Sequence, residues 1–178
     1  MKRAVTLIGL VIVIGAGGPA ADGADAKMRA CSLLTSADIT AAVGGTPGQP
    51  QESDLVVPEG PSKGDTMGMC AWPTSAQSSV SVAIIRAATG ASREAGLARM
   101  AQVFETLKAQ GWSEERKDFP NGRCLLMTPP ASAKGMPLST GCFAEAKGMG
   151  ISVGHNGPAR VSVEKVRALL DKAIGRLP

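Results

Sequence analysis

The chain has 178 residues and a formal net charge of +4, with 44% hydrophobic and 19% charged residues, which is typical of a globular protein. With no Tyr, three Phe and two Trp, it has few of the aromatic side chains on which single-stranded nucleic acids stack. Basic and acidic residues are interspersed without a basic block, so we expect no nucleic-acid partner.

A cleavable signal peptide is predicted for residues 1–26. Lys2 and Arg3 supply its basic start, and residues 4–14 supply the short apolar segment of an exported protein. This segment cannot cross a bilayer, because a spanning helix needs about 20 apolar residues. No later segment approaches that length, so we expect no transmembrane segment.

Small residues after the apolar segment offer cleavage sites. Ala24 and Ala26 form one candidate site, and Ala20 ends a second one. We expect cleavage between about residues 20 and 27 and a location in the periplasm or outside the cell. The remaining residues, 27–178, have the usual size of a single domain.

Four cysteines follow the predicted leader: Cys31, Cys70, Cys124 and Cys142. An even number of cysteines in an exported chain indicates disulfides, and four cysteines allow three pairings. The chain has no Cys-x-x-Cys pair and a single histidine, which argues against a thioredoxin-like centre and against structural zinc. We expect two disulfides and assign no metal or cofactor.

A short helix is predicted after Thr35. Thr35 and Asp38 have the spacing of a capping box, apolar residues follow at helical spacing, and Gly44 ends the helix. Residues 45–66 are rich in Gly, Pro and Ser, which predicts a long, mobile loop with at most one edge strand near residues 55–57.

A hairpin and a long helix come next. Alternating apolar and polar residues predict antiparallel strands over residues 67–72 and 79–87. Residues 92–110 carry apolar side chains at helical spacing, and Gly111 stands where a helix commonly ends. This pattern predicts an amphipathic helix.

In the second half of the chain, the sequence pattern predicts three more strands and a final helix. A turn at Asn121 leads into a strand over residues 124–128, and residues 140–146 and 150–155 form a hairpin. Ser162 stands at the start of the closing helix, whose apolar stripe fits packing against a core.

The two halves are alike in pattern. Cys70 leads to residues 80–82 (Val-Ser-Val) and Cys142 leads to residues 151–153 (Ile-Ser-Val) at nearly equal separations, with a helix after each hairpin. We expect an α+β fold with helices packed on one antiparallel sheet. The pattern is compatible with two β-β-α pseudo-repeats that share this sheet.

The segment Cys31-Ser32-Leu33-Leu34-Thr35-Ser36-Ala37-Asp38-Ile39, with the later Cys70-Ala71-Trp72, resembles a family of exported bacterial lipoproteins of unknown function. That family carries a Cys-x-Leu-Leu-Thr-x-x-acidic-aliphatic segment and a later Cys before an aromatic residue. The resemblance covers residues 31 to about 85 and implies a disulfide between Cys31 and Cys70. Lipidation of Cys31 is the alternative, which Met28 and Arg29 disfavour because a lipobox has small and aliphatic residues at those positions.

The other two cysteines, Cys124 and Cys142, lie on successive predicted strands separated by one loop. An antiparallel arrangement can bring their Cα atoms within the roughly 4.4–6.8 Å that a disulfide requires. We favour this sequential pairing. A bond between Cys70 and Cys142 is the alternative, expected if their strands are neighbours at the centre of the sheet.

His155, the single histidine, is the first candidate for chemistry. It stands at the end of a predicted strand beside Asn156 and Gly157, where an exposed turn residue is expected. No Gly-x-Ser-x-Gly motif accompanies it, and every cysteine is expected to be oxidised. We therefore assign no catalytic residue.

Methionines are the second candidate. Met67 and Met69 lie on one face of a predicted strand beside Cys70. With Met127, Met136 and Met149 they suggest a Cu(I) site, because thioethers select that ion. Methionine is also a common core residue, which is the simpler interpretation.

Paired carboxylates are the third candidate. Glu114 with Glu115, and Glu52 with Asp54, are possible acid–base pairs, but both lie in hydrophilic stretches and are expected to be solvated. We therefore expect a non-catalytic binding or accessory protein of the cell envelope, with a protein or another envelope component as its partner. An enzyme of unrecognised type and a copper-binding protein are the alternatives.

Overall fold

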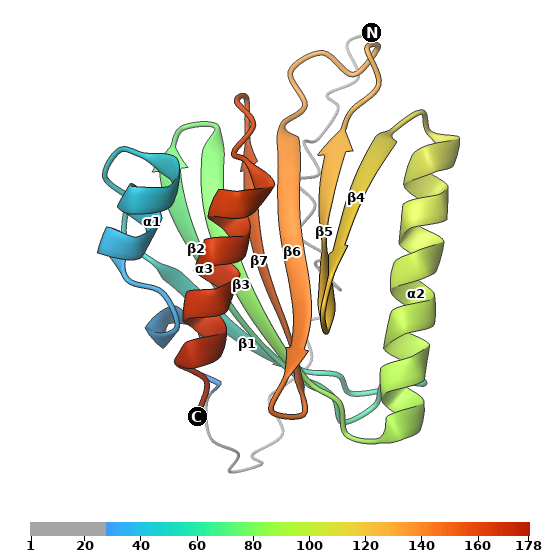
Figure 1. The fold of residues 1–178 in the computed structure, drawn as a ribbon. Helices are drawn as coiled ribbons and strands as arrows, with labels where there is room; N and C mark the ends of the chain where they lie inside the picture. Colours follow the sequence, from blue (N-terminus) through green and yellow to red (C-terminus); the bar gives the residue numbers. More distant parts are fainter. Residues whose placement is uncertain (1–27) are drawn as a thin grey trace, which may run out of the picture.

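The computed structural model describes residues 28–178, so the predicted leader (residues 1–26) and its cleavage sites lie outside the described part. Within residues 28–178, no helix is both long enough and apolar enough to cross a membrane. Seven antiparallel strands form one sheet in the order β1-β2-β3-β7-β6-β5-β4. Three α-helices accompany this sheet, which confirms the α+β class (Figure 1).

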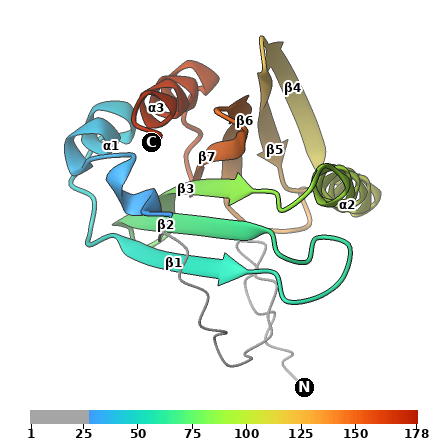
Figure 2. The ribbon, with the colours of Figure 1, turned by 90° about the horizontal axis from the view of Figure 1, so that it is seen from below.

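The strands are β1 (Gln51–Val56), β2 (Thr66–Ser75), β3 (Ser78–Arg86), β4 (Ser113–Phe119), β5 (Gly122–Thr128), β6 (Leu138–Ala146) and β7 (Met149–Gly157). The helices are the 3-10 turn η1 (Ala30–Ser32) and the α-helices α1 (Ser36–Val43), α2 (Gly90–Ala109) and α3 (Val163–Gly175). The sheet bends sharply between its two edges (Figure 2). Helices α1 and α3 lie inside the bend, whereas α2 lies on the other side of β4 and β5.

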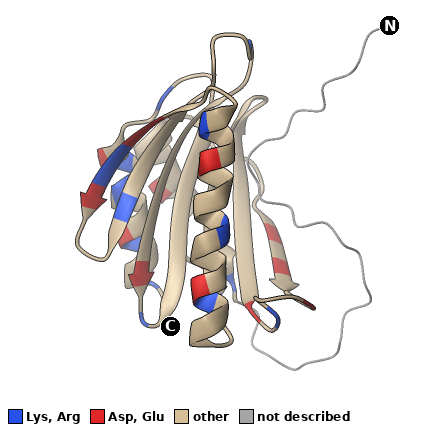
Figure 3. Ribbon diagram, turned by 90° about the vertical axis from the view of Figure 1, so that its right-hand side faces the viewer, with Lys and Arg blue, Asp and Glu red and all other residues tan. Residues whose placement is uncertain are grey.

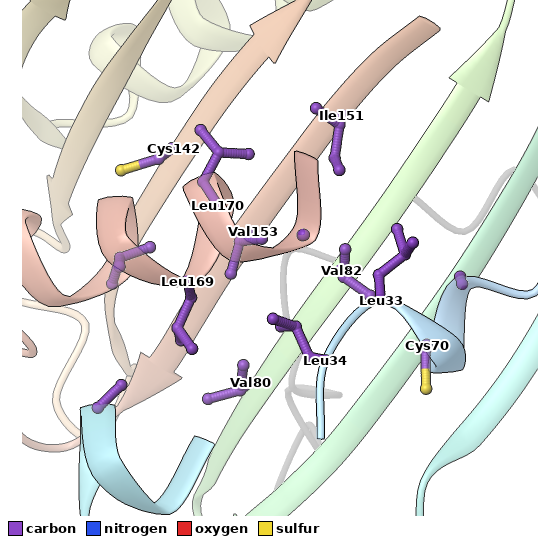
Figure 4. Packing of buried hydrophobic residues seen from close by; sticks show 14 of the residues in the cluster. Leu33, Leu34, Cys70, Val80, Val82, Cys142, Ile151, Val153, Leu169 and Leu170 are labelled. Atoms are coloured by element: carbon purple, nitrogen blue, oxygen red, sulfur yellow. The ribbon is translucent and has the colours of Figure 1, made fainter. Parts of the chain in front are cut away.

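The core fills the space inside this bend. Helix α3 turns its apolar stripe toward β6 and β7, and η1 covers β2 and β3 (Figure 4). Leu169 is 2% exposed and Leu170 is fully buried. Burying one such side chain stabilises the fold by about 1.5–3 kcal/mol, so α3 is the main helical cover of the core.

The sheet is arranged alike on both sides of its centre. Cys70 on β2 pairs with Val82 on β3, Val82 pairs with Val153 on β7, and Val153 pairs with Cys142 on β6. The two hairpins thus meet through β3 and β7, as two β-β-α units sharing one sheet require. Their helices differ, because α3 covers the core while Ser92 is the one buried residue of α2.

Two disulfides join the four cysteines. Cys31 bonds to Cys70 with a Cα–Cα distance of 4.9 Å, and Cys124 bonds to Cys142, its direct partner across β5 and β6. This is the sequential pairing that we favoured. Strands β3 and β7 separate Cys70 from Cys142, which rules out the alternative bond. With its sulfur in a disulfide, Cys31 has no thiol to carry a lipid.

One strand is longer than the sequence pattern predicted, and another was not predicted at all. We expected at most an edge strand near residues 55–57, but β1 begins at Gln51. We also assigned no strand to residues 113–119, where β4 lies. Both are edge strands with largely exposed, hydrophilic side chains, so backbone pairing forms them without the apolar alternation that reveals a strand.

The segment after β1 is held by hydrogen bonds rather than being an open loop. The Val57 N–H donates to the Asp65 carbonyl (2.9 Å), and the Gly64 N–H donates to the Val57 carbonyl (2.8 Å). The buried Asp65 carboxylate accepts from the Ala88 N–H (2.8 Å), which ties this segment to the start of α2. The mobility expected for residues 45–66 stays a prediction.

Charges of both signs are spread along α2 and the β4 edge (Figure 3). On β4, Glu115, Arg116, Lys117 and Asp118 are all exposed. Charged side chains on an edge strand oppose pairing with the edge of another molecule. We therefore expect this edge to be protected from unwanted strand pairing.

Candidate functional site

An open cavity of about 440 Å³ lies at one end of the sheet. The turn between β2 and β3, the end of β7, the C-terminal end of α1 and the N-terminal end of α3 meet there (Figure 1). Its polar lining consists of Thr74, Ser78, His155, Arg160, Ser162 and Lys165. Residues 42–44 at the end of α1, with Ala159 and Val161 before α3, form the rest of the wall.

His155 lines this cavity from within the sheet, so its predicted place in an exposed turn is wrong. Strand β7 continues to Gly157, and the alternation that buries Ile151 and Val153 also buries His155, which is 5% exposed. Its neighbours in the sheet are Val80 on β3 and Thr140 on β6.

The His155 ring has an unused polar atom. Its Nδ1 is buried and has no hydrogen-bond partner among the described residues. Burial lowers the pKa of His155 below its ordinary value, because the charged imidazolium is poorly solvated there. Most buried polar atoms in proteins have a partner, so this ring is a candidate for contact with a ligand or bound water.

Gly157 lets the His155 ring and Ser78 pack closely against the backbone. A Cβ at this position would lie 2.7 Å from Ser78 Oγ, 2.9 Å from His155 Cε1 and 3.2 Å from His155 Nε2. The Ser78 hydroxyl and the Nε2 edge of the ring therefore both lie next to Gly157. Any larger residue at position 157 would collide with them and displace them.

Two cationic side chains, Arg160 and Lys165, stand at the cavity. Arg160 donates to the Thr128 hydroxyl at the end of β5, which directs the guanidinium toward the sheet. Among residues 28–178, no carboxylate lines the cavity or forms an ion pair with either cation. The site is consequently electropositive.

The first turn of α3 adds free backbone donors. The first helical hydrogen bond runs from the Val166 N–H to the Ser162 carbonyl, and the Ser162 side chain caps no amide. The amides of residues 163–165 thus have no helical acceptor. Glu164 takes its own amide and lies 3.6 Å from Lys117, and it does not line the cavity.

A smaller hollow of about 140 Å³ continues between α1 and α3. Asp38 lies there, and its carboxylate accepts from Arg176 (2.6 Å) and Lys172 (2.7 Å). These two cations hold the pKa of Asp38 well below its usual range, together with hydrogen bonds from Thr35. Both oxygens of this carboxylate accept hydrogen bonds, so Asp38 joins the two helices and is not a free acid or base.

The methionines suggested for copper are not brought together. Met67 and Met69 lie on the face of β2 away from Cys70, whereas Met149 lies in the core. Met127 on β5 is separated from β2 by three strands, and Met136 lies in the loop before β6. No group of three metal-binding His, Cys, Asp or Glu side chains occurs in the described part of the chain.

The predicted carboxylate pairs also lie away from the cavity. Glu114 is less solvated than expected, because its side chain is 15% exposed and lies 3.6 Å from Lys108 of α2. Glu52 accepts a hydrogen bond from the Cys31 N–H (3.0 Å). Glu115 and Asp54 are exposed on the edge strands β4 and β1.

No model of a known protein family matches this chain, and no curated protein matches it in sequence. Among solved structures, the chain is similar to the extracellular domain of PknH from Mycobacterium tuberculosis, with a TM-score of 0.56 and 15% sequence identity. The similarity covers 86% of this chain and 96% of that domain. At this identity the two proteins are shown to share a fold.

Proposed function

We propose that this chain is an extracytoplasmic, non-catalytic binding domain that holds a small component of the cell envelope in the cavity over His155. The observation that carries the proposal is the buried His155 ring at the wall of the cavity, whose Nδ1 has no partner among the described residues. An unpaired buried polar atom costs about 1–3 kcal/mol. The other ring nitrogen, Nε2, also has no partner among the described residues, and a ligand in the cavity can supply one.

Three observations support a location outside the cytoplasm. Both disulfides are typical of proteins in an oxidising compartment. The fold is similar to a domain described as extracellular. The sequence also predicts a signal peptide, so we propose a periplasmic or secreted protein.

An enzyme is the second candidate, because Ser78 and His155 both line the cavity and both lie next to Gly157. Nucleophilic catalysis by such a pair needs a third group, usually a carboxylate, to orient the histidine through its other nitrogen. The Nδ1 atom of His155 lacks that partner in the described residues. This missing partner favours binding over catalysis.

The proposal is tested by NMR of the chain from residue 27 onward, with small-molecule fractions of an envelope extract added. We expect one or more fractions to shift the resonances of Ser78, His155 and Lys165. The variant Gly157→Ala places a Cβ against Ser78 and His155, displaces both side chains and should abolish these shifts. Gly96→Ala on α2 is the matched control, because a Cβ at Gly96 meets no atom within 4 Å.

The proposal is overturned if every fraction leaves the cavity resonances unchanged, or if Gly157→Ala and wild type respond alike. Hydrolysis of a compound in these fractions, lost with either Ser78→Ala or His155→Gln, would support the enzyme instead. Should Gly157→Ala fail to fold, Ser78→Leu places a larger side chain in the cavity wall from the β2–β3 turn.

A further inference from the structure

We infer that the group anchored in this cavity is a phosphate, carried by a small organic molecule. The inference rests on the proposed binding function and names the chemical class of the ligand. It is carried by the combination of two cations, free helix amides and neutral donors around one space.

Charge is the first argument. Arg160 and Lys165 line the cavity without a carboxylate to neutralise them in the described residues. A guanidinium and an ammonium on one small site match the charge of a phosphate monoester, which is close to a dianion at neutral pH. A neutral or cationic ligand would leave both charges without a counter-charge.

The start of α3 is the second argument. This helix has 13 residues, and Ser162 and Lys165 at its start line the same cavity. The positive end of the helix dipole favours a bound anion at this position. The Glu164 carboxylate accepts from its own amide and from the Ser162 hydroxyl, so the amides of residues 163 and 165 are the ones left without an acceptor among the described residues.

The buried histidine is the third and independent argument. A buried N–H without an acceptor is rarer in proteins than a buried acceptor without a donor. Since Nδ1 has no described partner, we place the single ring proton of neutral His155 on Nε2, at the ring edge near Gly157 and Ser78. This N–H and the Ser78 hydroxyl can both donate to a phosphate oxygen.

Size argues for an organic phosphate rather than the free ion. A volume of about 440 Å³ is many times that of a phosphate, which has only five heavy atoms. The remaining space accommodates a small polar group such as a glycerol or a sugar. Because the cavity is open, a longer substituent can also extend into solvent.

The test is calorimetric titration of the chain from residue 27 onward with inorganic phosphate, glycerol phosphate and acetate. We expect glycerol phosphate to bind most tightly and acetate most weakly. Lys165→Gln and Arg160→Gln should each weaken glycerol phosphate binding about tenfold, as expected for loss of a charge-assisted hydrogen bond. Lys63→Gln removes the same charge from an exposed loop and should change affinity less than about twofold.

Co-sedimentation with vesicles distinguishes the two sources of a phosphate monoester. Binding to vesicles of phosphatidic acid in phosphatidylcholine, lost with Lys165→Gln, would support the inference with a lipid headgroup as the source. Binding of glycerol phosphate without vesicle binding would support a soluble phosphate ester.

Two results would overturn the inference and separate it from the proposed function. If an envelope fraction shifts the cavity resonances but no phosphate or phosphatidic acid vesicle binds, the phosphate assignment is wrong and the binding function stands. If acetate binds as tightly as glycerol phosphate, the phosphate assignment is likewise wrong and the binding function stands. If neither the phosphates nor any envelope fraction shifts the cavity resonances, the phosphate inference and the proposed binding function are both wrong.

Discussion

Asp38 is the residue that couples two distant parts of the sequence. Its carboxylate closes the capping box at the start of α1 with Thr35 and also accepts from Lys172 and Arg176 of the C-terminal region. The side chain is only 9% exposed, whereas those of the two cations are 48% and 39% exposed. When the Asp38 charge is removed, Lys172 and Arg176 therefore stay solvated. The loss of stability then comes mainly from the hydrogen bonds that Asp38 no longer accepts.

We expect Asp38→Asn to lower the free energy of unfolding by about 2 kcal/mol at neutral pH. Because the folded pKa of Asp38 lies below its unfolded value, this stabilisation is present above about pH 4 and is lost as the pH falls further. Urea unfolding of both proteins at neutral and acidic pH measures the difference. The gap should shrink on acidification.

Asp171→Asn is the matched control for this substitution. Asp171 is 61% exposed and lies 3.9 Å from Arg167, so its loss should change stability by no more than about 0.5 kcal/mol. Equal effects of the two variants, or a gap that is constant with pH, would contradict the role given to Asp38.

At the scale of elements, α2 and α3 are both helices with an apolar stripe but have different surroundings. The stripe of α3 is buried, whereas Leu97 in the stripe of α2 is 52% exposed and its other members are half-buried. Periodicity predicts which residues share a helical face. It does not show how closely that face approaches the sheet, which is set by tertiary packing.

We expect Leu169→Ala to destabilise the protein by about 2–4 kcal/mol, because it leaves a cavity between α3 and the sheet. Leu97→Ala makes the same change on α2 and should cost less than about 1 kcal/mol, since much of the side chain is already solvated. Thermal or urea unfolding checks the pair. A cost for Leu97→Ala equal to that of Leu169→Ala would show that α2 packs as tightly as α3.

Across the whole molecule, the two disulfides stabilise separate halves of the sheet. They link positions 39 and 18 residues apart, for which loop-closure entropy gives a stabilisation of about 4 and about 3 kcal/mol. We expect the double variant Cys31→Ala/Cys70→Ala to lose more stability than Cys124→Ala/Cys142→Ala. Urea unfolding under non-reducing conditions checks the order, and the reverse order would contradict an entropic origin.

The five inner strands of the sheet and both disulfides could be predicted from alternation, turn residues and the motif around Cys31, whereas β4 and most of β1 lack apolar alternation and could not. The burial of His155 could also have been predicted, because it continues the alternation of Ile151 and Val153 along β7. The Asn-Gly pair after His155 indicated a turn instead and concealed this. The cavity itself could not be predicted. It forms only where residues 42–44 of α1 meet Ser162, which is remote in sequence.

The central claim is that His155 is a buried residue at a ligand-binding cavity, and its ring signal tests this because the chain has one histidine. Lys165 of α3 and Arg160 before it are the charged groups that line this cavity. An NMR pH titration of the free chain should give a His155 pKa below the ordinary value of 6.5, and glycerol phosphate should raise it. A pKa at or above 6.5 that no ligand changes would show an exposed turn residue and contradict the account.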